Sequence, residues 1–585
     1  GTTSTPQNIN GNWNAFGMFG FNSALKNKKF TINSFSRVNY RNQVAFLYNK
    51  ETLHDDKNTT TGLTLAENLN GSYRNDWFEF SLNGSIEYTA ERSKLRPEKN
   101  QNPYTFSYGA STNVTLPWQM TLSTNITNQS RRGYDDASLN NNELIWNAQI
   151  AQSLLKGAAT VSFEMYDILK QQSKEKLISK KGFTRLIKRP MAEYQAQKAF
   201  KCPDEQYQLM RFFRKVNNAL PFEGNATEVF TDGYSMLYSL MKEISKAKHH
   251  IHLQFYIFED DPAGRLLRDV LIDKARQGVE VRLLYDDVGC WKVPHAFFDE
   301  MRGAGIEARS FLKVRFPLFT SKVNYRNHRK IVVIDGRVAY MGGMNIALRY
   351  MKGFPWGIWR DTHIKIEGKA VYGLQTAFLT DWYVVDRTLI TSSRYFPEVG
   401  IFGKALIQIV TSDPVGEWRD IMQGLLIAIS SSRKYFYIQT PYLLPTEPIL
   451  MALKTAALAG VDVRIMIPAR ADTWITHLGS LSYLDDIMRA GVRIYLYQKG
   501  FLHSKLMVSD DTLSTVGSTN MDFRSFEHNF EVNAFMYDPA SALMLKGIFL
   551  QDQKDAILLQ RKTWMKRPWY QKAQESIVRL LAPLL

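Results

Sequence analysis

One short pattern occurs twice in this chain and limits its possible folds more than any other feature. Residues 327–340 read NHRKIVVIDGRVAY, and residues 502–512 read LHSKLMVSDDT. Each contains a His, a Lys two positions later and an Asp five positions after the Lys, and the two His are 175 positions apart. Composition alone predicts about 0.03 such matches in a chain of this size. The pattern therefore indicates a duplicated structural unit.

The sequence before each copy also follows one plan. A helix end leads into an apolar strand, a longer helix follows, and a second apolar strand begins directly after a Gly. These segments are residues 243–258, 264–278 and 279–287 in the first copy and residues 428–444, 448–460 and 461–469 in the second. Strand, helix and strand at this spacing form a βαβ unit. We therefore expect two similar α/β halves with mostly parallel sheets that are covered by helices.

The agreement between the copies continues beyond the triplet. An Asn stands 17 residues after each His, and a carboxylate follows further along the chain. These residues are Asn345 and Asp361 in the first copy and Asn520 and Glu531 in the second. Because both copies carry the complete set, the sequence predicts a single active site that is assembled from two halves.

The His and Lys of each triplet suit an anionic substrate. On a strand, two residues separated by one position project from the same face. If the halves face each other, His328 and His503 would flank a pocket that also contains Lys330 and Lys505. One His can then attack the phosphorus of a phosphodiester while the other protonates the leaving oxygen. A metal site is disfavoured, because the lysines would repel a cation and no zinc-ligand spacing occurs.

The remaining polar residues of the two copies have supporting roles in this scheme. Asn345 and Asn520, with the lysines, would hold the non-bridging phosphate oxygens. Asp361 and Glu531 are candidates to accept a hydrogen bond from the far nitrogen of each imidazole.

The Asp of each triplet is also a candidate catalytic residue, although its position favours another role. The odd offset of Asp335 and Asp510 from their His places them on the other strand face or in a turn, so we favour a positioning role. The remaining histidines singled out by the sequence are expected to be structural: His249, His250, His252 and His363.

The paired triplets resemble the signature of the phospholipase D superfamily. The contexts GGMN, WRDTH and GSTNMDFRSFEHNFEVN are similar to its bacterial cardiolipin synthase branch, over residues 191–585. The resemblance implies that two phosphatidylglycerol molecules become cardiolipin and glycerol through a phosphohistidine, without a cofactor or metal. It also implies that His328 is the nucleophile, that His503 is the acid and base, and that the protein acts at the bacterial inner membrane, bound peripherally or anchored.

The residues alone leave other functions open. The same pair of histidines could hydrolyse a phospholipid or a nucleic-acid phosphodiester. In a different class, the chain could be an outer-membrane or binding protein with an inactive passenger domain. Residues 173–585 hold 57 Lys and Arg against 42 Asp and Glu, and such a surface attracts phosphates of either source. We expect anionic membrane lipid rather than nucleic acid as the partner, and the sequence leaves the oligomeric state open.

Residues 1–172 have a different character. They alternate apolar and polar residues over long stretches with polar turns, which predicts antiparallel strands. They resemble the last strands of the outer-membrane receptor-like β-barrels of Bacteroidota, which would imply an outer-membrane location. We expect a join near Gln172 and four parts: residues 1–172, a basic linker and helical lead-in at 173–215, and two halves at 216–395 and 396–585.

Three smaller features complete the expectations. The basic stretch at residues 173–189 is interpreted as a solvated linker rather than a membrane-surface helix. Residues 561–572, RKTWMKRPWYQK, mix cations with aromatic rings, which favours the lipid headgroup layer over stacking on single-stranded nucleic acid. Cys202 and Cys290, the only cysteines, are expected to be buried thiols, and no apolar run is long enough for a transmembrane helix.

Overall fold

The structure is a computed structural model that divides the chain into two compact units, Gly1–Lys174 and Glu175–Leu585. It describes residues 11–25, 29–48, 55–94, 100, 102–118, 120–133, 140, 142–154, 159–165, 180–197, 203–312 and 325–581. The predicted join near Gln172, the first part of the basic stretch and Cys202 lie outside the described residues.

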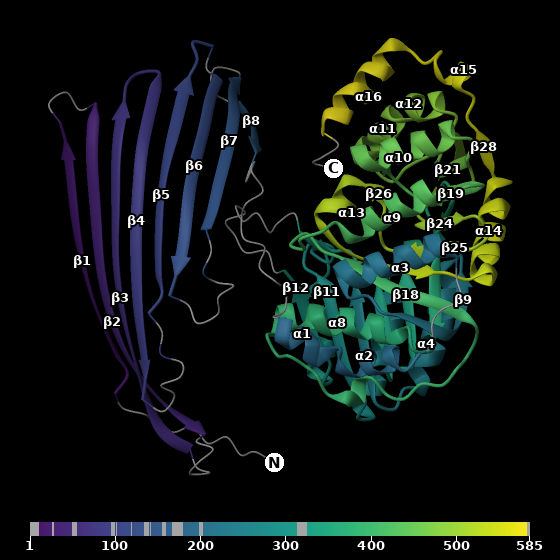
Figure 1. Cartoon of the computed structure of the whole chain (residues 1–585), viewed down its shortest axis with the longest axis horizontal. Coiled ribbons are helices and arrows are strands. Elements are labelled where there is room, and N and C mark those ends of the chain that lie inside the picture. The colour runs from purple at the N-terminus through teal and green to yellow at the C-terminus, as the bar shows by residue number, and fades with distance from the viewer. Residues whose placement is uncertain are drawn as a thin grey trace. The chain divides into compact units, whose positions relative to one another are not determined.

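The N-terminal unit is an antiparallel sheet in which eight strands follow one another in chain order (Figure 1). The strands are β1 (Trp13–Ala24), β2 (Phe30–Tyr48), β3 (Asp55–Arg74), β4 (Phe78–Ser93), β5 (Tyr104–Thr115), β6 (Met120–Arg132), β7 (Asn142–Leu154) and β8 (Ala159–Met165). The predicted antiparallel segment is therefore present.

The register gives this sheet one apolar and one polar face. Leu82 lies opposite Ala110, which lies opposite Ile126, and Ile126 lies opposite Trp146. The next positions along the same strands, from Asn83 to Gly109, lie on the other face. Because directly opposed residues of an antiparallel pair point to one face, the alternation in the sequence becomes two faces of different polarity.

The C-terminal unit is built on one large mixed sheet that runs through both predicted halves. Its first half contains β9 (Pro221–Phe230), β10 (His250–Phe255), β11 (Glu280–Asp286), β12 (Glu307–Phe311), β14 (Ile331–Ile334), β15 (Val338–Gly342) and β17 (His363–Glu367). Its second half contains β18 (Ala405–Ser412), β19 (Tyr435–Gln439), β21 (Asp462–Pro468), β22 (Arg493–Tyr497), β24 (Leu506–Ser509), β25 (Leu513–Gly517), β27 (Asn529–Met536) and β28 (Ala556–Leu558).

The order of these strands shows the duplication directly. From one edge the first half runs β12-β11-β10-β14-β15-β17-β9, and the second continues β18-β27-β25-β24-β19-β21-β22-β28. Apart from β28, the second half repeats the first in reversed order, and the antiparallel pair β9 and β18 joins them. The prediction of two duplicated α/β halves is confirmed.

The sheet is parallel only where the βαβ units lie. β10 pairs in parallel with β11, and β19 with β21, as expected. The strands that follow each His are antiparallel hairpins instead: β14 turns into β15 through Asp335 and Gly336, with φ of 52° and 66°. Two successive residues of positive φ form the tight turn that joins antiparallel strands. A mostly parallel sheet is therefore correct for the βαβ units but wrong for the rest of each half.

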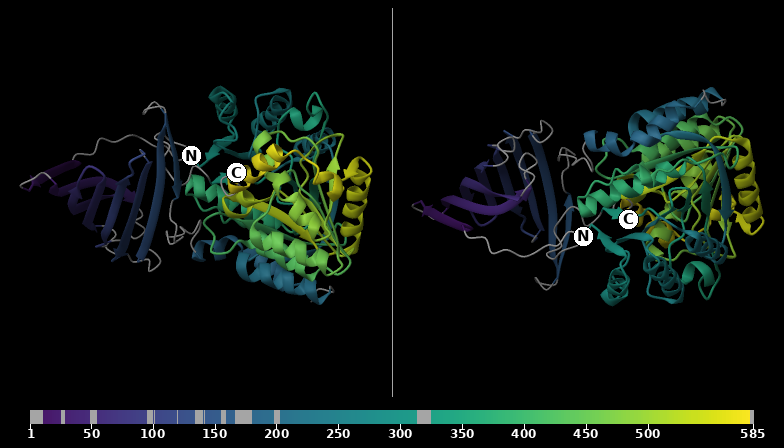
Figure 2. Two further views of the ribbon diagram at one scale, coloured as in Figure 1. Left: turned by 90° about the horizontal axis from the view of Figure 1, so that it is seen from above. Right: turned by 90° about the horizontal axis from the view of Figure 1, so that it is seen from below.

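Helices cover both faces of this sheet (Figure 2). One face packs on α8 (Val371–Asp386) and α14 (Pro539–Gln553), which share a core that spans both halves. The opposite face packs on α4 (Gly233–Lys246), α5 (Pro262–Arg276) and α6 (His295–Gly303) in the first half. In the second half it packs on α3 (Asp204–Asn217), α9 (Asp420–Ser431), α10 (Glu447–Leu458) and α12 (Leu484–Arg489). Burial on both faces explains the continuous apolar run IVVI of β14.

The remaining elements are short or peripheral. They are α1 (Lys180–Leu186), α2 (Lys188–Gln195), α7 (Arg349–Lys352), η5 (Ser393–Tyr395), α11 (Trp474–Ser482), α13 (Phe523–Glu527), α15 (Arg561–Trp564), α16 (Trp569–Leu581), β20 (Leu443–Leu444) and β26 (Met521–Asp522). None of the helices in the described part of the chain has both the length and the apolar character that a membrane crossing needs.

The described part of the basic stretch is not a solvated linker. Leu186 and Ile187 are buried, and Leu186 belongs to the core that spans both halves. Burying two aliphatic side chains ties α1 and the start of α2 to the C-terminal unit.

Candidate active site

Two short parallel strand pairs bring the triplets into contact with the opposite half. β13 (Arg326–Asn327) pairs with β27, and β16 (Ile358–Arg360) pairs with β23 (Gly500–Leu502). The N–H of His328, just after β13, donates to Phe530 O at 3.0 Å. The N–H of His503, just after β23, donates to Arg360 O at 2.7 Å. Each catalytic candidate is therefore fixed by backbone of the other half.

Each imidazole contacts a carboxylate that belongs to the opposite half. His328 Nδ1 lies 3.0 Å from Glu531 Oε1 and 3.1 Å from Oε2. His503 Nδ1 lies 2.6 Å from Asp361 Oδ2. The sequence predicted Asp361 and Glu531 for this contact, and the structure adds that each serves the His of the other half. An Nδ1–H that donates to a carboxylate leaves the lone pair on Nε2, which is the form a nucleophile or base needs.

Each carboxylate is itself held in place, by different means. Ser518 Oγ donates to Glu531, and Asn529 Nδ2 donates to it at 3.1 Å. Asp361 accepts the N–H of Thr362 at 2.7 Å. Gly343, in the chain position equivalent to Ser518, has no room for a side chain, since an added Cβ would lie 2.1 Å from Asp361 Oδ1.

The two lysines are buried beside the histidines. Lys330 Nζ donates to His328 O at 2.5 Å, and Lys505 Nζ donates to His503 O. Lys505 Nζ also lies 2.9 Å from His503 Nδ1, but that nitrogen cannot accept from the ammonium while it donates to Asp361, and the carboxylate contact is shorter. The charge of each lysine also lowers the pKa of the His in the other triplet, so the four groups interact electrostatically with one another.

Burial governs the charges of this cluster. Desolvation lowers the pKa of His328 to about 4 and that of His503 to about 3, despite the adjacent carboxylates. Desolvation also lowers the pKa of Lys505 to about 8 and that of Lys330 well below its usual range. At neutral pH both imidazoles of the free protein are therefore neutral.

The carboxylates of the cluster stay ionised. Burial raises the pKa of Glu531, but the hydrogen bonds from His328 and Ser518 and the charge of Lys330 outweigh burial, so the pKa lies below its usual value. For Asp361 the charge of Lys505 and the contact with His503 likewise outweigh burial.

Aromatic rings and the two predicted Asn line the same region. The ring of Tyr256 lies 5.2 Å from the His328 ring, and that of Tyr350 lies 5.9 Å from the His503 ring. Asn345 Oδ1 accepts the N–H of Ile257 at 3.0 Å, and its Nδ2 donates to Tyr350 Oη at 2.5 Å. Asn520 Nδ2 donates to Asp522 at 3.0 Å. Each amide thus uses one N–H within the protein.

The Asp of each triplet is engaged elsewhere, at the far end of the strand that follows the His. Asp335 accepts the N–H groups of Lys248, His249 and His250 at 2.8 to 2.9 Å. Asp510 accepts those of Arg433, Lys434 and Tyr435 at 2.7 to 2.9 Å. Both carboxylates therefore fix the start of the neighbouring strand, β10 or β19, to the hairpin turn.

Of the other histidines that the sequence singled out, His250, His252 and His363 are buried, whereas His249 is exposed. His250 Nε2 and His252 Nδ1 both contact the amide of Gln375, at 3.0 and 2.8 Å. His363 Nδ1 accepts the N–H of Met344 at 3.4 Å. Cys290 is a buried free thiol, as expected.

Sequence reasoning missed two buried ion pairs behind the carboxylates. Arg329 Nη1 lies 2.6 and 2.7 Å from the oxygens of Asp381 on α8, while its Nε donates to Glu531 O at 3.0 Å. Arg360 reaches Asp552 on α14 at 2.7 and 3.0 Å and donates to Asp361 O. Each guanidinium thus holds the backbone of a carboxylate residue that orients an imidazole.

One signal in the sequence pointed to these pairs. Arg329 stands inside the first triplet, and Arg360 directly precedes Asp361. Their Asp partners lie on distant helices without any distinctive motif, so only the fold identifies them.

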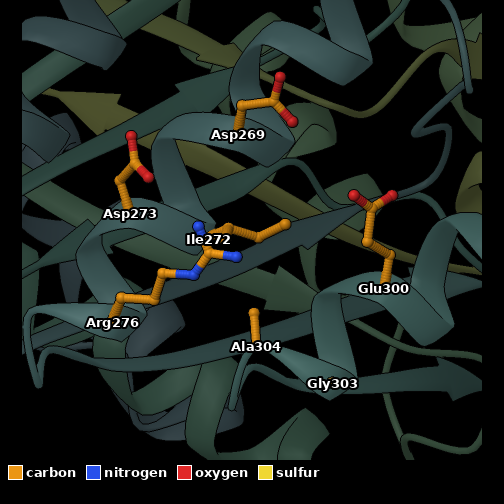
Figure 3. A pocket seen from close by; sticks show the side chains of 7 residues that line it. All are labelled: Asp269, Ile272, Asp273, Arg276, Glu300, Gly303 and Ala304. Atoms are coloured by element: carbon orange, nitrogen blue, oxygen red, sulfur yellow. The ribbon is translucent and has the colours of Figure 1, made fainter.

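A pocket on the surface of the first half lies apart from these residues. It has a volume of about 480 Å³ and lies between α5 and α6, where Asp269, Asp273 and Glu300 face Arg276 (Figure 3). Its lining contains none of the predicted site residues. Within the described ranges no group of His, Cys, Asp and Glu is arranged to hold a metal ion.

Comparisons with known proteins identify the family of this chain. A family model described as "Cardiolipin synthase, PLD-like domain" matches residues 240–382 and 425–553, one segment in each half. A cardiolipin synthase of Geobacillus sp. (strain WCH70) is 40% identical over 420 residues, which are 70% of this chain and 83% of that protein. The major cardiolipin synthase ClsA of Bacillus subtilis (strain 168) is 43% identical over 376 residues, 63% of this chain and 77% of that protein.

A solved structure shares the fold. Phosphatidylserine synthase of Haemophilus influenzae Rd KW20 has a TM-score of 0.51 at 15% identity and covers 65% of this chain and 100% of that chain. The duplicated sheet and the paired triplets thus define a phospholipase D-like protein. With relatives of this identity and coverage, the chain belongs to the cardiolipin synthase family. The resemblance of residues 1–172 to outer-membrane receptors stays a prediction.

The buried pair of Arg329 and Asp381 should contribute strongly to stability. Replacing Asp381 with Asn removes the carboxylate that pairs directly with the buried guanidinium, which costs about 3 to 5 kcal/mol in the free energy of unfolding. The exposed pair Arg302 and Asp299, at 2.7 Å, is the matched control, and Asp299→Asn should cost less than about 1 kcal/mol. Urea unfolding measures both, and equal losses would contradict the assignment.

Stability should fall as the pH drops below about 6.5. Burial lowers the folded-state pKa of five histidines, to about 2 for His250, about 3 for His363 and His503, and about 4 for His252 and His328. Between pH 6.5 and these values only the unfolded chain binds the protons, so stability is complete above 6.5 and decreases below it.

Each histidine contributes a slope of up to about 1.4 kcal/mol per pH unit. Urea unfolding at pH 7.5, 6.5 and 5.5 measures this slope. The buried carboxyl of Asp420 reduces the slope, because burial raises its pKa to about 7 and its contribution to stability therefore has the opposite sign. A free energy of unfolding that stays constant over this interval would show that these imidazoles are not neutral in the fold.

Proposed function

We propose that this chain is a cardiolipin synthase that transfers a phosphatidyl group from one phosphatidylglycerol to another through a phosphohistidine. The observation that carries the proposal is that each imidazole is hydrogen-bonded to a carboxylate of the opposite half. His328 and His503 are each held in the Nε2 lone-pair form by a residue of the opposite half, so both belong to one site. Membership of the cardiolipin synthase family supports the choice of substrate.

The first step forms the covalent intermediate. The Nε2 lone pair of His328 attacks phosphorus, the bond from phosphorus to the glycerol oxygen breaks, and that oxygen takes a proton from Nε2 of His503. The assignment of His328 as nucleophile follows the family resemblance. His503 must first gain a proton, and an anionic phosphodiester beside it raises its pKa for this purpose. The contact with Asp361 stabilises the imidazolium that results.

The second step reverses these roles. A hydroxyl of the second phosphatidylglycerol gives its proton to His503 Nε2 and attacks phosphorus. The bond from phosphorus to His328 then breaks and releases cardiolipin. Lys330 and Lys505, with the remaining N–H of Asn345 and Asn520, would stabilise the charge on the non-bridging oxygens in both steps.

The remaining site candidates act through structure in this proposal. Asp335 and Asp510 hold the hairpin turns and are positioning residues rather than participants. The substrates also place the protein at the bacterial cell membrane, in contact with anionic lipid.

Incubation of the full chain with phosphatidylglycerol tests the function. We expect equal amounts of cardiolipin and glycerol, since each transfer releases one glycerol. Free phosphatidic acid without cardiolipin would show that water is the acceptor and would replace the proposal with a hydrolase. Cleavage of DNA without any lipid product would identify a nuclease.

Replacing His328 tests the covalent mechanism. His328→Ala should lower turnover by about 10⁴ or more, because the nucleophile is lost. His295→Ala, at an exposed position at the start of α6, is the control and should leave turnover unchanged. A loss of less than tenfold for His328→Ala would contradict its role.

A further inference from the structure

The C-terminal helix α16 presents two unlike faces. Val578 and Glu575 are buried, and Val578 packs near Gly479 of α11. Trp569, Ile577 and Leu580 are 79%, 62% and 81% exposed. These three residues, with Ala573, are spaced by four, four and three positions, so they form one row along the helix. A row of large apolar side chains in water is unusual for a surface helix and indicates a contact surface.

Cations surround this apolar row. Residues 561–581 contain six Lys and Arg and one acid, Glu575. Arg567 is paired with Glu575, whereas Lys562, Lys566 and Lys572 have no ion pair among the described residues. Exposed aromatic and aliphatic side chains together with ammonium groups that lack a counter-charge match the headgroup layer of an anionic bilayer, where the rings and the charges both find partners.

The helix on which α16 packs begins near the candidate active site. α16 packs on α11, as Figure 1 shows at the end of the chain. α11 begins at Trp474, which is 68% exposed. Two residues earlier, Asp472 accepts the hydroxyl of Tyr442 at 2.9 Å, and its charge acts on Lys505 of the second triplet. The start of α11 therefore lies near the site, and α11 itself packs against α16.

We propose that α16 and the exposed start of α11 form the surface on which the C-terminal unit lies against a bilayer that contains anionic phospholipid. The choice of a bilayer rests on the proposed function, because a phosphatidyl substrate reaches the site from its own membrane. In this arrangement Asp472, two residues before α11, lies near the headgroups. A lipid then moves only a short way from the bilayer to the histidines. The lysines attract the protein to the anionic lipid, and the apolar side chains of the row insert into the bilayer.

A fluorescent probe on α16 tests this surface locally. In the full chain with Cys202→Ser, Leu580→Cys is labelled with the environment-sensitive dye NBD; Cys290 is buried and does not compete. Vesicles of phosphatidylglycerol and phosphatidylcholine should raise the emission severalfold and shift it to the blue, and pure phosphatidylcholine should do so less. The control is Ile401→Cys, 85% exposed beside Gly224 of β9, whose label should not respond.

The charge requirement is tested separately. Replacing Lys562, Lys566 and Lys572 with Gln should weaken the response at position 580 to anionic vesicles by about tenfold or more, because each cation near the surface contributes about 1 kcal/mol. No change at position 580 on addition of anionic vesicles would overturn the proposal. A change that depends on protein concentration without vesicles would assign the surface to a second copy and also overturn it.

The outcome is separable from that of the proposed function. Cardiolipin formation by the same labelled proteins is measured with phosphatidylglycerol dispersed in detergent micelles, which need no docking surface. If the micelle assay yields cardiolipin while the emission of the probe does not change with vesicles, only the proposed surface is contradicted. If the probe responds but no cardiolipin forms, only the function is wrong.

Discussion

The hydrogen bonds between each imidazole and a carboxylate of the opposite half are the interactions on which this structure depends. His328 with Glu531 and His503 with Asp361 each join residues more than 140 positions apart in the chain. Because neither half holds a complete pair, the duplicated units must pack face to face for either imidazole to be oriented. The central β9 and β18 pair and the crossed strands β13 and β16 provide that packing. Function and fold are thus secured by the same contacts.

Two buried Arg–Asp pairs behind these hydrogen bonds connect the carboxylate residues to helices. Arg329 and Arg360 connect Asp381 of α8 and Asp552 of α14 to the backbone of Glu531 and Asp361. Buried charge pairs are costly to break, so the positions of the carboxylates are tightly constrained. The same low-dielectric surroundings keep both imidazoles neutral in the free protein. In the proposed mechanism a bound phosphodiester raises the pKa of His503, while His328 stays neutral and keeps its lone pair.

The chain combines two units with different physical requirements. The N-terminal sheet exposes apolar side chains such as Leu82 and Trp146 on one face. The C-terminal unit buries its apolar residues on both sides of its sheet and exposes a smaller apolar row on α16. Alternation with period two and continuous apolar runs in the sequence correspond to these two kinds of sheet.

The sequence by itself determined the duplication, the two α/β halves, the antiparallel N-terminal sheet and the candidate residues of the site, because these follow from local spacing and periodicity. It even placed Asp361 and Glu531 beside the imidazoles. Only the tertiary structure decided which carboxylate contacts which His, which strand Asp335 and Asp510 each fix to its hairpin turn, and that Asp381 and Asp552 lie behind the site. These depend on the crossing of strands between halves and on helix packing, and distances across a fold leave no regular spacing along a chain.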